Sequence, residues 1–305
     1  MIMKLKYTFL VVCMMMLCTH ARAQIISTVA GRQHGYGILS DEGGPALSAQ
    51  LRTPYAMATD PAGNIYFTTN DNRIRKLNAA TNTVSTIAGT GVAGFSGDGG
   101  AATSAQFHFG LPSMAVDASG NIYISDDMNS RIRKITASTG IVSTILLSTN
   151  AYNPLALTLD GTNTLYYVDN NYVRKINLAT LVVTNIGGNG SYGYTGDGGA
   201  ATAASFGFVE RMALYGNTLY LCDEGFSVVR RIKLNTGVIS TYAGNGSYSY
   251  TGDGGQAISA GLGSNMGIAV DASGNLFIGQ QGFGVVRKID QATKIITTAA
   301  GTGIT

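Results

Sequence analysis

The chain is built from one pattern of short sequence segments, which we call phrases, and the pattern recurs along nearly its whole length. A segment of the type Ser-Thr-Ile-Ala-Gly occurs six times, at spacings of 58, 58, 41, 56 and 57 residues. Its copies lie at 27–31, 85–89, 143–146, 184–188, 240–244 and 297–301. Self-similarity on this scale indicates structural units that bury their apolar residues only by packing on their neighbours.

Three further phrases follow each copy in a constant order. One leads into a turn such as Asp-Ala-Ser-Gly-Asn at 117–121, the next is apolar and rich in tyrosine, and the last contains an arginine, as in 131–135. Each phrase alternates apolar and polar residues, which is the pattern of a half-buried strand. We label these three strands A, B and C, and the Ser-Thr-Ile-Ala-Gly strand D. Four short antiparallel strands per unit predict an all-β fold, a β-propeller of four-stranded antiparallel blades.

The wording of the phrases is similar to that of a known family. "VDASGNIYISD" followed by "NSRIRKI" (116–135), together with "GDGGAATSAQF" (97–107), resembles the NHL-repeat family of six-bladed β-propellers. The resemblance covers nearly all of 25–305 and is that of a bacterial exported NHL repeat-containing protein. Members of this family mainly serve as interaction or ligand-binding platforms, and a minority are enzymes, so the resemblance implies a binding role.

The repeat count predicts an incomplete ring. The units run over about 25–83, 84–141, 142–182, 183–238 and 239–295, and a sixth begins at 296–305. Strand D therefore occurs six times but the A-B-C set only five times. We interpret this as five A-B-C units plus an extra D strand of a six-bladed ring, with the chain a fragment of a longer protein. The alternative is closure as five blades with one spare strand.

Residues that repeat in every unit are interpreted as architecture, because a catalytic group is needed once per site. Equivalent arginines occur in all five units, and we predict that they staple the blades by pairing with turn aspartates such as Asp117; they are Arg75, Arg133, Arg174, Arg230 and Arg287. The segment Gly-Asp-Gly-Gly at 97–100, 196–199 and 252–255 is predicted to be a tight turn. Its glycines allow positive φ, and its aspartate is expected to bind its own backbone two residues on.

Residues 1–23 are expected to be a cleaved signal peptide. Lys4 and Lys6 precede an apolar run, and Ala-Arg-Ala at 21–23 offers a small-x-small cleavage site after Ala23. The run is too short and wrongly flanked for a spanning helix, so we expect no membrane insertion of the mature chain. The predicted location is secreted, periplasmic or at the cell surface.

Charge and cysteine content exclude some classes of protein for the mature domain, 24–305. The leader holds three of the 20 Lys and Arg residues and none of the 17 Asp and Glu residues, so 17 of each remain and the net charge is zero. Nucleic acid is therefore not an expected partner, because phosphate binding requires an excess of cationic residues. Cys222 is the one cysteine outside the leader and is predicted to be a buried structural thiol.

The loops between strands D and A are long, about 20 residues in most units. Each of three loops carries an aromatic residue two positions before Gly-Asp-Gly-Gly: Phe95, Tyr194 and Tyr250. One interpretation is that these rings cap the blades as small satellite cores. The other is that they form a rim that stacks on sugars or peptides.

Carboxylates in the same loops raise the hypothesis of a metal site. Asp98, Asp197 and Asp253, together with acidic residues of the B–C turns, place many oxygen atoms on one face. Ca²⁺ binds six to eight such oxygens, so we consider a calcium site beside the alternative of solvated turn residues.

Residues that break the repeat are stronger candidates for a site. Glu210 and Arg211 stand at the start of strand A, where the other units have neither, and Tyr55 and Asn265 are their neighbours by position in the unit. We predict that these four residues lie near the mouth of the central channel and bind a ligand; the alternative is a Glu-Arg pair that satisfies itself. The favoured function is an exported, non-catalytic platform for a protein, peptide or glycan on the loop-rich face. The alternative is a divalent-metal-dependent lactonase- or lyase-like enzyme in the channel.

Overall fold

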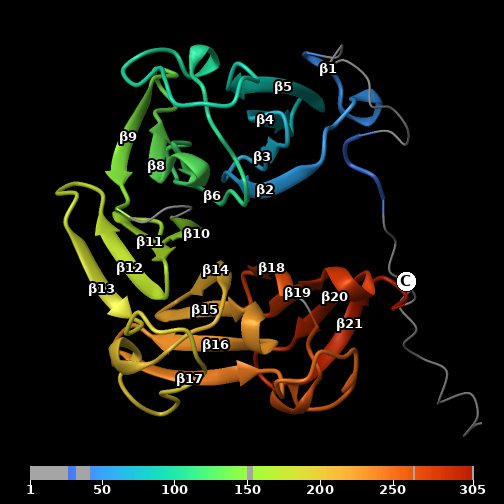
Figure 1. Cartoon of the computed structure of the whole chain (residues 1–305). Coiled ribbons are helices and arrows are strands. Elements are labelled where there is room, and N and C mark those ends of the chain that lie inside the picture. Colours follow the sequence, from blue (N-terminus) through green and yellow to red (C-terminus); the bar gives the residue numbers. More distant parts are fainter. Residues whose placement is uncertain (1–26, 32–41, 150–153, 264, 304–305) are drawn as a thin grey trace, which may run out of the picture.

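Five four-stranded antiparallel sheets are arranged around a central axis in the computed structural model, which describes residues 27–31, 42–149, 154–263 and 265–303 (Figure 1). Each sheet is one blade. The strands are β2 (Pro54–Thr59), β3 (Ile65–Thr69), β4 (Arg73–Asn78) and β5 (Thr83–Ala88) in blade 1; β6 (Met114–Val116), β7 (Ile122–Asp126), β8 (Arg131–Ile135) and β9 (Val142–Leu147) in blade 2; β10 (Leu155–Leu159), β11 (Thr164–Asp169), β12 (Tyr172–Asn177) and β13 (Val183–Gly187) in blade 3; β14 (Val209–Tyr215), β15 (Thr218–Asp223), β16 (Val228–Lys233) and β17 (Val238–Ala243) in blade 4; and β18 (Asn265–Val270), β19 (Leu276–Gln280), β20 (Val285–Ile289) and β21 (Ile296–Ala300) in blade 5.

This architecture confirms the predicted all-β propeller. In each blade the A, B and C strands of one unit are closed by the D strand of the next unit, so β5 completes the sheet begun by β2. The short segment β1 (Gly44–Pro45) adds to the outer edge of β5. Single-turn 3₁₀ helices are the other elements: η1 (Ala46–Ser48), η2 (Ala102–Ser104), η3 (Asp127–Asn129), η4 (Ala201–Ala203), η5 (Glu224–Phe226), η6 (Ala257–Ser259) and η7 (Gln281–Phe283). None of the helices in the described ranges has the length and apolar character to cross a membrane.

The core lies between the blades. The apolar side chains of alternating strand positions face the next blade and form a buried cluster at each of the four interfaces. Between blades 1 and 2, for example, Ile74 and Ala88 pack with Ile122 and Ile124. Cys222 belongs to the cluster between blades 4 and 5, where burial raises the pKa of its thiol to about 12. The prediction of a buried structural thiol is confirmed.

The sixth blade of the predicted ring is not present in the described residues. The inner strands pack on one another in succession from β2 to β18, and no packing of that extent joins β18 back to β2. Figure 1 shows the ring open between blades 5 and 1. The first copy of the D phrase belongs to no sheet over its described part, 27–31, although Gly31 donates to the carbonyl of Ala46 as Gly89 does to that of Ala102. The predicted leader, 1–23, lies outside the described residues.

The Gly-Asp-Gly-Gly segments hold each D–A loop against the blade that follows the loop in the sequence. In the loop before blade 2, Gly99 donates to the carbonyl of Val142 at 2.8 Å, and the carbonyl of Gly100 accepts from Val142 at 3.0 Å. The segment thus covers the outer strand β9. A Cβ atom at Gly97 would lie 2.7 Å from Ala105, which explains the first glycine. We call the equivalent segments 42–44, 97–100, 196–199 and 252–255 the clamp segments.

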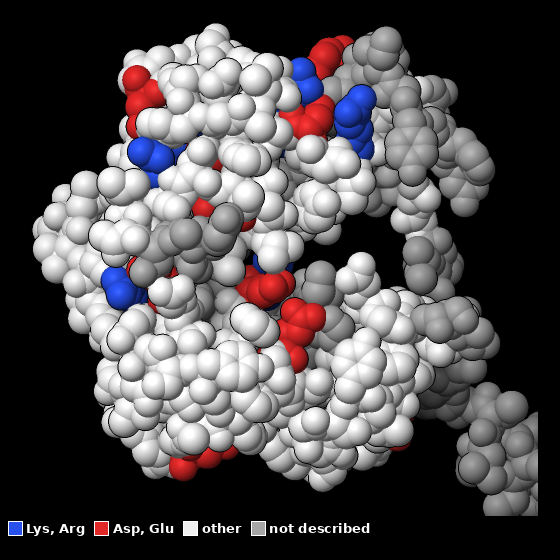
Figure 2. Space-filling model, viewed as in Figure 1, with Lys and Arg blue, Asp and Glu red and all other residues white. Residues whose placement is uncertain are grey.

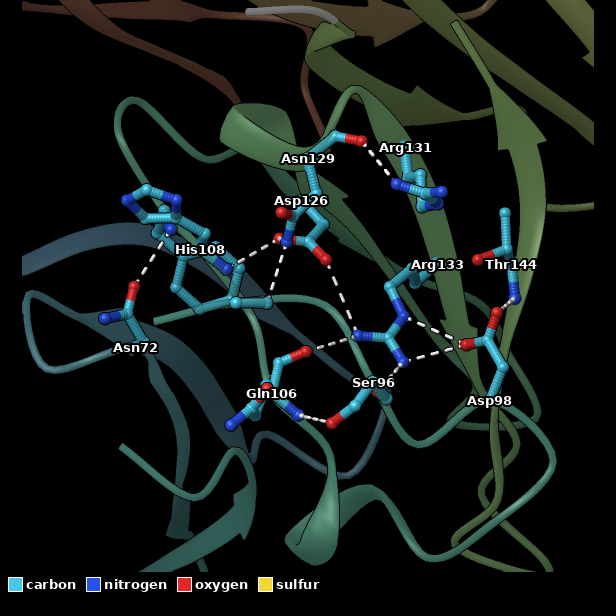
Figure 3. A network of polar contacts seen from close by, with 12 residues as sticks. Asn72, Ser96, Asp98, Gln106, His108, Asp126, Asn129, Arg131, Arg133 and Thr144 are labelled. Atoms are coloured by element: carbon cyan, nitrogen blue, oxygen red, sulfur yellow. Dashed lines mark hydrogen bonds and ion pairs between the residues drawn. The ribbon is translucent and has the colours of Figure 1, made fainter. Parts of the chain in front are cut away.

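The clamp aspartate binds the arginine of the blade, and this corrects two details of the sequence analysis. Asp98 accepts from Nε and Nη2 of Arg133 at 3.1 and 2.8 Å, and from the backbone of Thr144 (Figure 3). It does not bind its own backbone as predicted. The predicted partner Asp117 instead accepts from Asn121 and Tyr123 within its own A–B turn. The error arose because the partners come from different phrases of the repeat.

In blade 2 the arginine is buried, and each of its side-chain nitrogens has a hydrogen-bond acceptor. Besides Asp98, Arg133 donates to the carbonyls of Gln106 and Ser96 and lies 3.5 Å from Asp126. Burial alone would raise the pKa of Asp98, but hydrogen bonds from Thr144 and the Arg133 guanidinium outweigh it and lower that pKa. The prediction of blade staples is confirmed for four units, in which Arg75, Arg133, Arg230 and Arg287 pair with Glu42, Asp98, Asp197 and Asp253.

Replacing the staple arginine should destabilise the fold far more in a clamped blade than in blade 3, where the described residues hold no clamp segment. We expect Arg133→Met to lower the free energy of unfolding by about 3–5 kcal/mol, because Asp126 and Asp98 then lack their cation. Arg174→Met, at the same register position in blade 3, should lower it by about 1–2 kcal/mol. Urea unfolding followed by circular dichroism measures both, and equal losses would contradict the clamp.

Candidate binding site on the loop-rich face

The D–A loops and the B–C turns meet on one face, as the sequence analysis expected. Turn carboxylates hold the loops: Asp126 accepts from the backbone of His108, Asp127 from Gly110 and Leu111, and Asp223 from Gly207. Burial raises the pKa of Asp127, and these backbone hydrogen bonds oppose that shift. The turn acids that suggested a metal site in the sequence therefore act as acceptors for loop N–H groups.

The three predicted loop aromatics lie over the staple arginines. The Phe95 ring lies 3.7 Å from the Arg131 guanidinium and 5.0 Å from that of Arg133. The rings of Tyr194 and Tyr250 lie 4.8 and 5.1 Å from Arg230 and Arg287. Both tyrosine hydroxyls also bind a threonine of the outer strand, Thr241 or Thr298. This geometry matches the interpretation of aromatic caps, and each of the three residues stays partly exposed.

Phe208, which the sequence analysis did not select, and Tyr192 lie beside Tyr194 and are more exposed than it. Phe208 and Tyr192 are 61% and 55% exposed, and their ring centroids lie 5.3 Å apart. Tyr192 also lies 5.5 Å from Phe226 of η5, which stacks with Tyr194. We call these four residues the aromatic cluster. The signal in the sequence is Phe-X-Phe, at 107–109 and again at 206–208; its second ring is exposed at Phe208 and half-buried at Phe109.

A groove of about 200 Å³ lies beside Phe208, between blades 3 and 4. Its lining is apolar except for two asparagines and a carboxylate; it consists of Leu155, Val168, Asn170, Asn171, Gly207, Phe208, Val209 and Glu210. The side chain of Glu210 is half-buried and has no hydrogen bond or ion pair with the described residues. Burial raises its pKa, the charge of Glu224 adds to that shift, and the charge of Arg211 opposes it. The groove therefore offers one unpaired acidic group next to exposed aromatic rings.

Glu210 and Arg211 face different spaces, since Glu210 lines the groove and Arg211 lines the central cavity. The pairing of β14 with β15 shifts register between Val209 and Arg211, as the pairing of strands A and B also does in blades 1, 3 and 5. Arg211 donates to the backbone carbonyl of Glu210 at 2.8 Å, not to its carboxylate. The described residues thus do not show the self-satisfied Glu-Arg pair of the alternative interpretation.

The central cavity, of about 480 Å³, is lined by inner strands of all five blades. Tyr55 and Arg211 line it, as the sequence analysis predicted, while Glu210 lines the neighbouring groove. The backbone of Asn265 in β18 pairs with Gln280 of β19, and the side chain of Asn265 lies outside the described part. Figure 2 shows the centre of this view hollowed, with acidic side chains beside the hollow and a largely uncharged surface around it.

The three aspartates proposed as calcium ligands lie in three different clamp segments. Asp98, Asp197 and Asp253 each pair with the staple arginine of a different blade, at 2.6–2.8 Å. Across the described ranges, no three His, Cys, Asp or Glu side chains lie close enough to share a metal ion. The geometry assigns these carboxylates to arginine and leaves the calcium hypothesis without a ligand set there.

Comparison with known proteins supports the fold. No family model matches the chain, and no curated protein matches it in sequence. A solved protein of unknown function from Bacteroides thetaiotaomicron superposes with a TM-score of 0.65 and 23% identity, over 90% of this chain and 64% of that one, just under two thirds of its length. A chain of the nidogen–laminin complex gives 0.59 at 14% identity, covering 83% and 81%. Virginiamycin B lyase from Staphylococcus aureus gives 0.51 at 13%, covering 80% and 69%. The chain is a β-propeller, similar in fold to a chain of the nidogen–laminin complex and to a lyase.

Calcium should not stabilise the clamp segments. We expect thermal unfolding curves in excess calcium and in a chelator to coincide, because each clamp carboxylate is already bound to arginine. Asp98→Asn, as a control, should unfold at a lower temperature in both buffers. A saturated site would add about 2.7 kcal/mol at 100 times its Kd, so a rise of several degrees with calcium would contradict this assignment.

Proposed function

We propose that the chain is an exported, non-catalytic binding protein of the NHL-repeat type, which holds a protein, peptide or glycan on the loop-rich face. The observation that carries this proposal is the aromatic cluster beside the groove of Glu210. Tyr and Phe rings supply a large contact area at small loss of conformational entropy, and such rings dominate binding energy at interfaces. An unpaired carboxylate beside them accepts hydrogen bonds from hydroxyl or amine groups of a ligand.

Three finer points belong to the same proposal. The leader at 1–23 directs export, with cleavage after Ala23. The ring closes as six blades, which is supported by the D copy at 27–31 that joins no sheet and by an apolar hollow on blade 5 lined by Gly267, Val285 and Val286. A protein ligand is supported by the similarity in fold to a chain of the nidogen–laminin complex; a metal-dependent channel enzyme, as in the lyase-like alternative, is the competing proposal.

Ligand screening with matched variants tests this proposal. The full chain is applied to a glycan array and to a random peptide library, and the best binder is measured against Phe208→Ala, Tyr192→Ala and Glu210→Gln. We expect each aromatic truncation to weaken binding by about 30-fold, the effect of losing a central aromatic contact. Ile141→Ala, an exposed apolar change in the C–D turn at the opposite end of its blade, should leave binding unchanged.

The contrary outcomes point to the alternative. Binding that is insensitive to Phe208→Ala and Tyr192→Ala would remove the aromatic cluster from the site. Metal-dependent turnover of a lactone, lost in Arg211→Ala of the central cavity, would support the enzyme.

A further inference from the structure

Four of the five blades have their outer strand covered by a clamp segment. The same hydrogen bond recurs in each, from a clamp glycine to the carbonyl at the first or second position of the outer strand, and each measures 2.8 Å: Gly43 to Val84, Gly99 to Val142, Gly198 to Ile239 and Gly254 to Ile296. The covered apolar residue of the outer strand is completely buried in all four blades. Covering an edge in this way is how sheets avoid pairing with other chains.

Blade 3 lacks this cover within the described residues. The connection from β9 to β10 is short, spanning 148–154, and contains no Gly-Asp-Gly-Gly sequence. No described residue pairs with the outer edge of β13, which lies at the rim of the ring in Figure 1. Val183, the equivalent of the four buried residues, is only half-buried, and Leu181 and Val182 beside it are exposed. The edge is therefore open and partly apolar.

The staple of blade 3 also lacks its clamp carboxylate. Arg174 pairs with Asn185 of β13 in the register that joins Arg133 to Thr144 in blade 2. Its side chain is 30% exposed, whereas the other four staples are 0–2% exposed, and its ion pair is with Asp169 of its own sheet at 3.3 Å. Its Nε has no partner, as in Arg75 and Arg287, but those two have a clamp carboxylate on another nitrogen.

We propose that β13 is a strand-addition site for an extended segment of another protein that carries an acidic residue followed by glycine. Its carboxylate would bind Arg174 and the outward N–H of Asn185, as Asp98 binds Arg133 and Thr144. The residue after the clamp acid has a φ between +75° and +83° in all four clamps (Gly43, Gly99, Gly198 and Gly254), which favours glycine. Strand addition gives affinity through main-chain hydrogen bonds and specificity through such side-chain contacts.

A second copy of this chain does not fit the site. Its own clamp segments are held by their blades, and β13 contains no acidic residue. Two β13 edges placed together would also bring two Arg174 side chains toward each other without a carboxylate between them. The charge at this edge thus selects an acidic partner segment. The site lies on the outer rim, away from the groove of Glu210, so the proposal for β13 does not depend on the proposed function.

A clamp peptide tests the site directly. A fluorescent peptide Thr-Gly-Asp-Gly-Gly-Ala-Ala-Thr, the sequence of 195–202, is titrated with the full chain by fluorescence anisotropy. We expect saturable binding, weakened about 10-fold or more by Arg174→Met or by Asn in place of the peptide Asp, because a charged hydrogen-bond pair is lost. Asn185→Pro should also abolish binding, and its melting temperature should stay close to that of the parent, because the lost N–H points away from β12.

Two controls separate the site from general charge effects. Lys175→Met removes a positive charge from the same strand, where Lys175 lines a different hollow with Thr184, and should leave peptide binding unchanged. Phe208→Ala should likewise have no effect. No binding at millimolar peptide, or equal affinity for the Asp and Asn peptides, would overturn the proposal. A concentration-dependent dimer that Asn185→Pro abolishes would also overturn it, since the edge would then be used by a second copy.

Discussion

The buried arginine at the centre of each clamped blade is the interaction on which the architecture depends. A guanidinium can be taken out of water only if its donors find acceptors, because an unpaired buried charge is strongly destabilising. The blade alone cannot supply these acceptors to Arg133. The preceding loop provides the carbonyls of Ser96 and Gln106 and the carboxylate of Asp98. Burial of the arginine therefore requires the loop to be folded onto the blade, and the loop in turn covers the outer strand.

This dependence explains which parts of the fold could be predicted from the sequence. Strands and A–B turns are local structures. The alternation of apolar and polar residues predicted the strands, and the sequence Asp-X-X-Gly-Asn predicted the turns. Asp60 does bind the backbone of Asn64. The repetition of the arginines indicated a structural role. Their partners could not be found from spacing, because Asp98 and Arg133 are 35 positions apart and meet only when the loop packs on the blade. The number of blades needed for closure is likewise a property of the whole ring.

The candidate site shows the same limit. Glu210 and Arg211 were recognised because they break the repeat, and Arg211 does line the central cavity with Tyr55. The groove that Glu210 lines could not be predicted, because its residues come from two blades and meet only in the folded protein. Phe208 was missed because exposure depends on which ring the neighbouring loop covers. Features that depart from the repeat, including the uncovered β13, are where this propeller differs from its own pattern.

The central claim is that the arginine and the clamp carboxylate stabilise the fold together, not separately. A double-mutant cycle on blade 4 measures this with Arg230→Met, Asp197→Asn and the double variant, using the free energy of unfolding in urea. Arg230 and Asp197 lie 2.7 Å apart. We predict a coupling energy of about 2 kcal/mol, within the range seen for residues in one network. Effects that add to within about 0.5 kcal/mol would contradict the account, since they would show that the clamp does not depend on this pair.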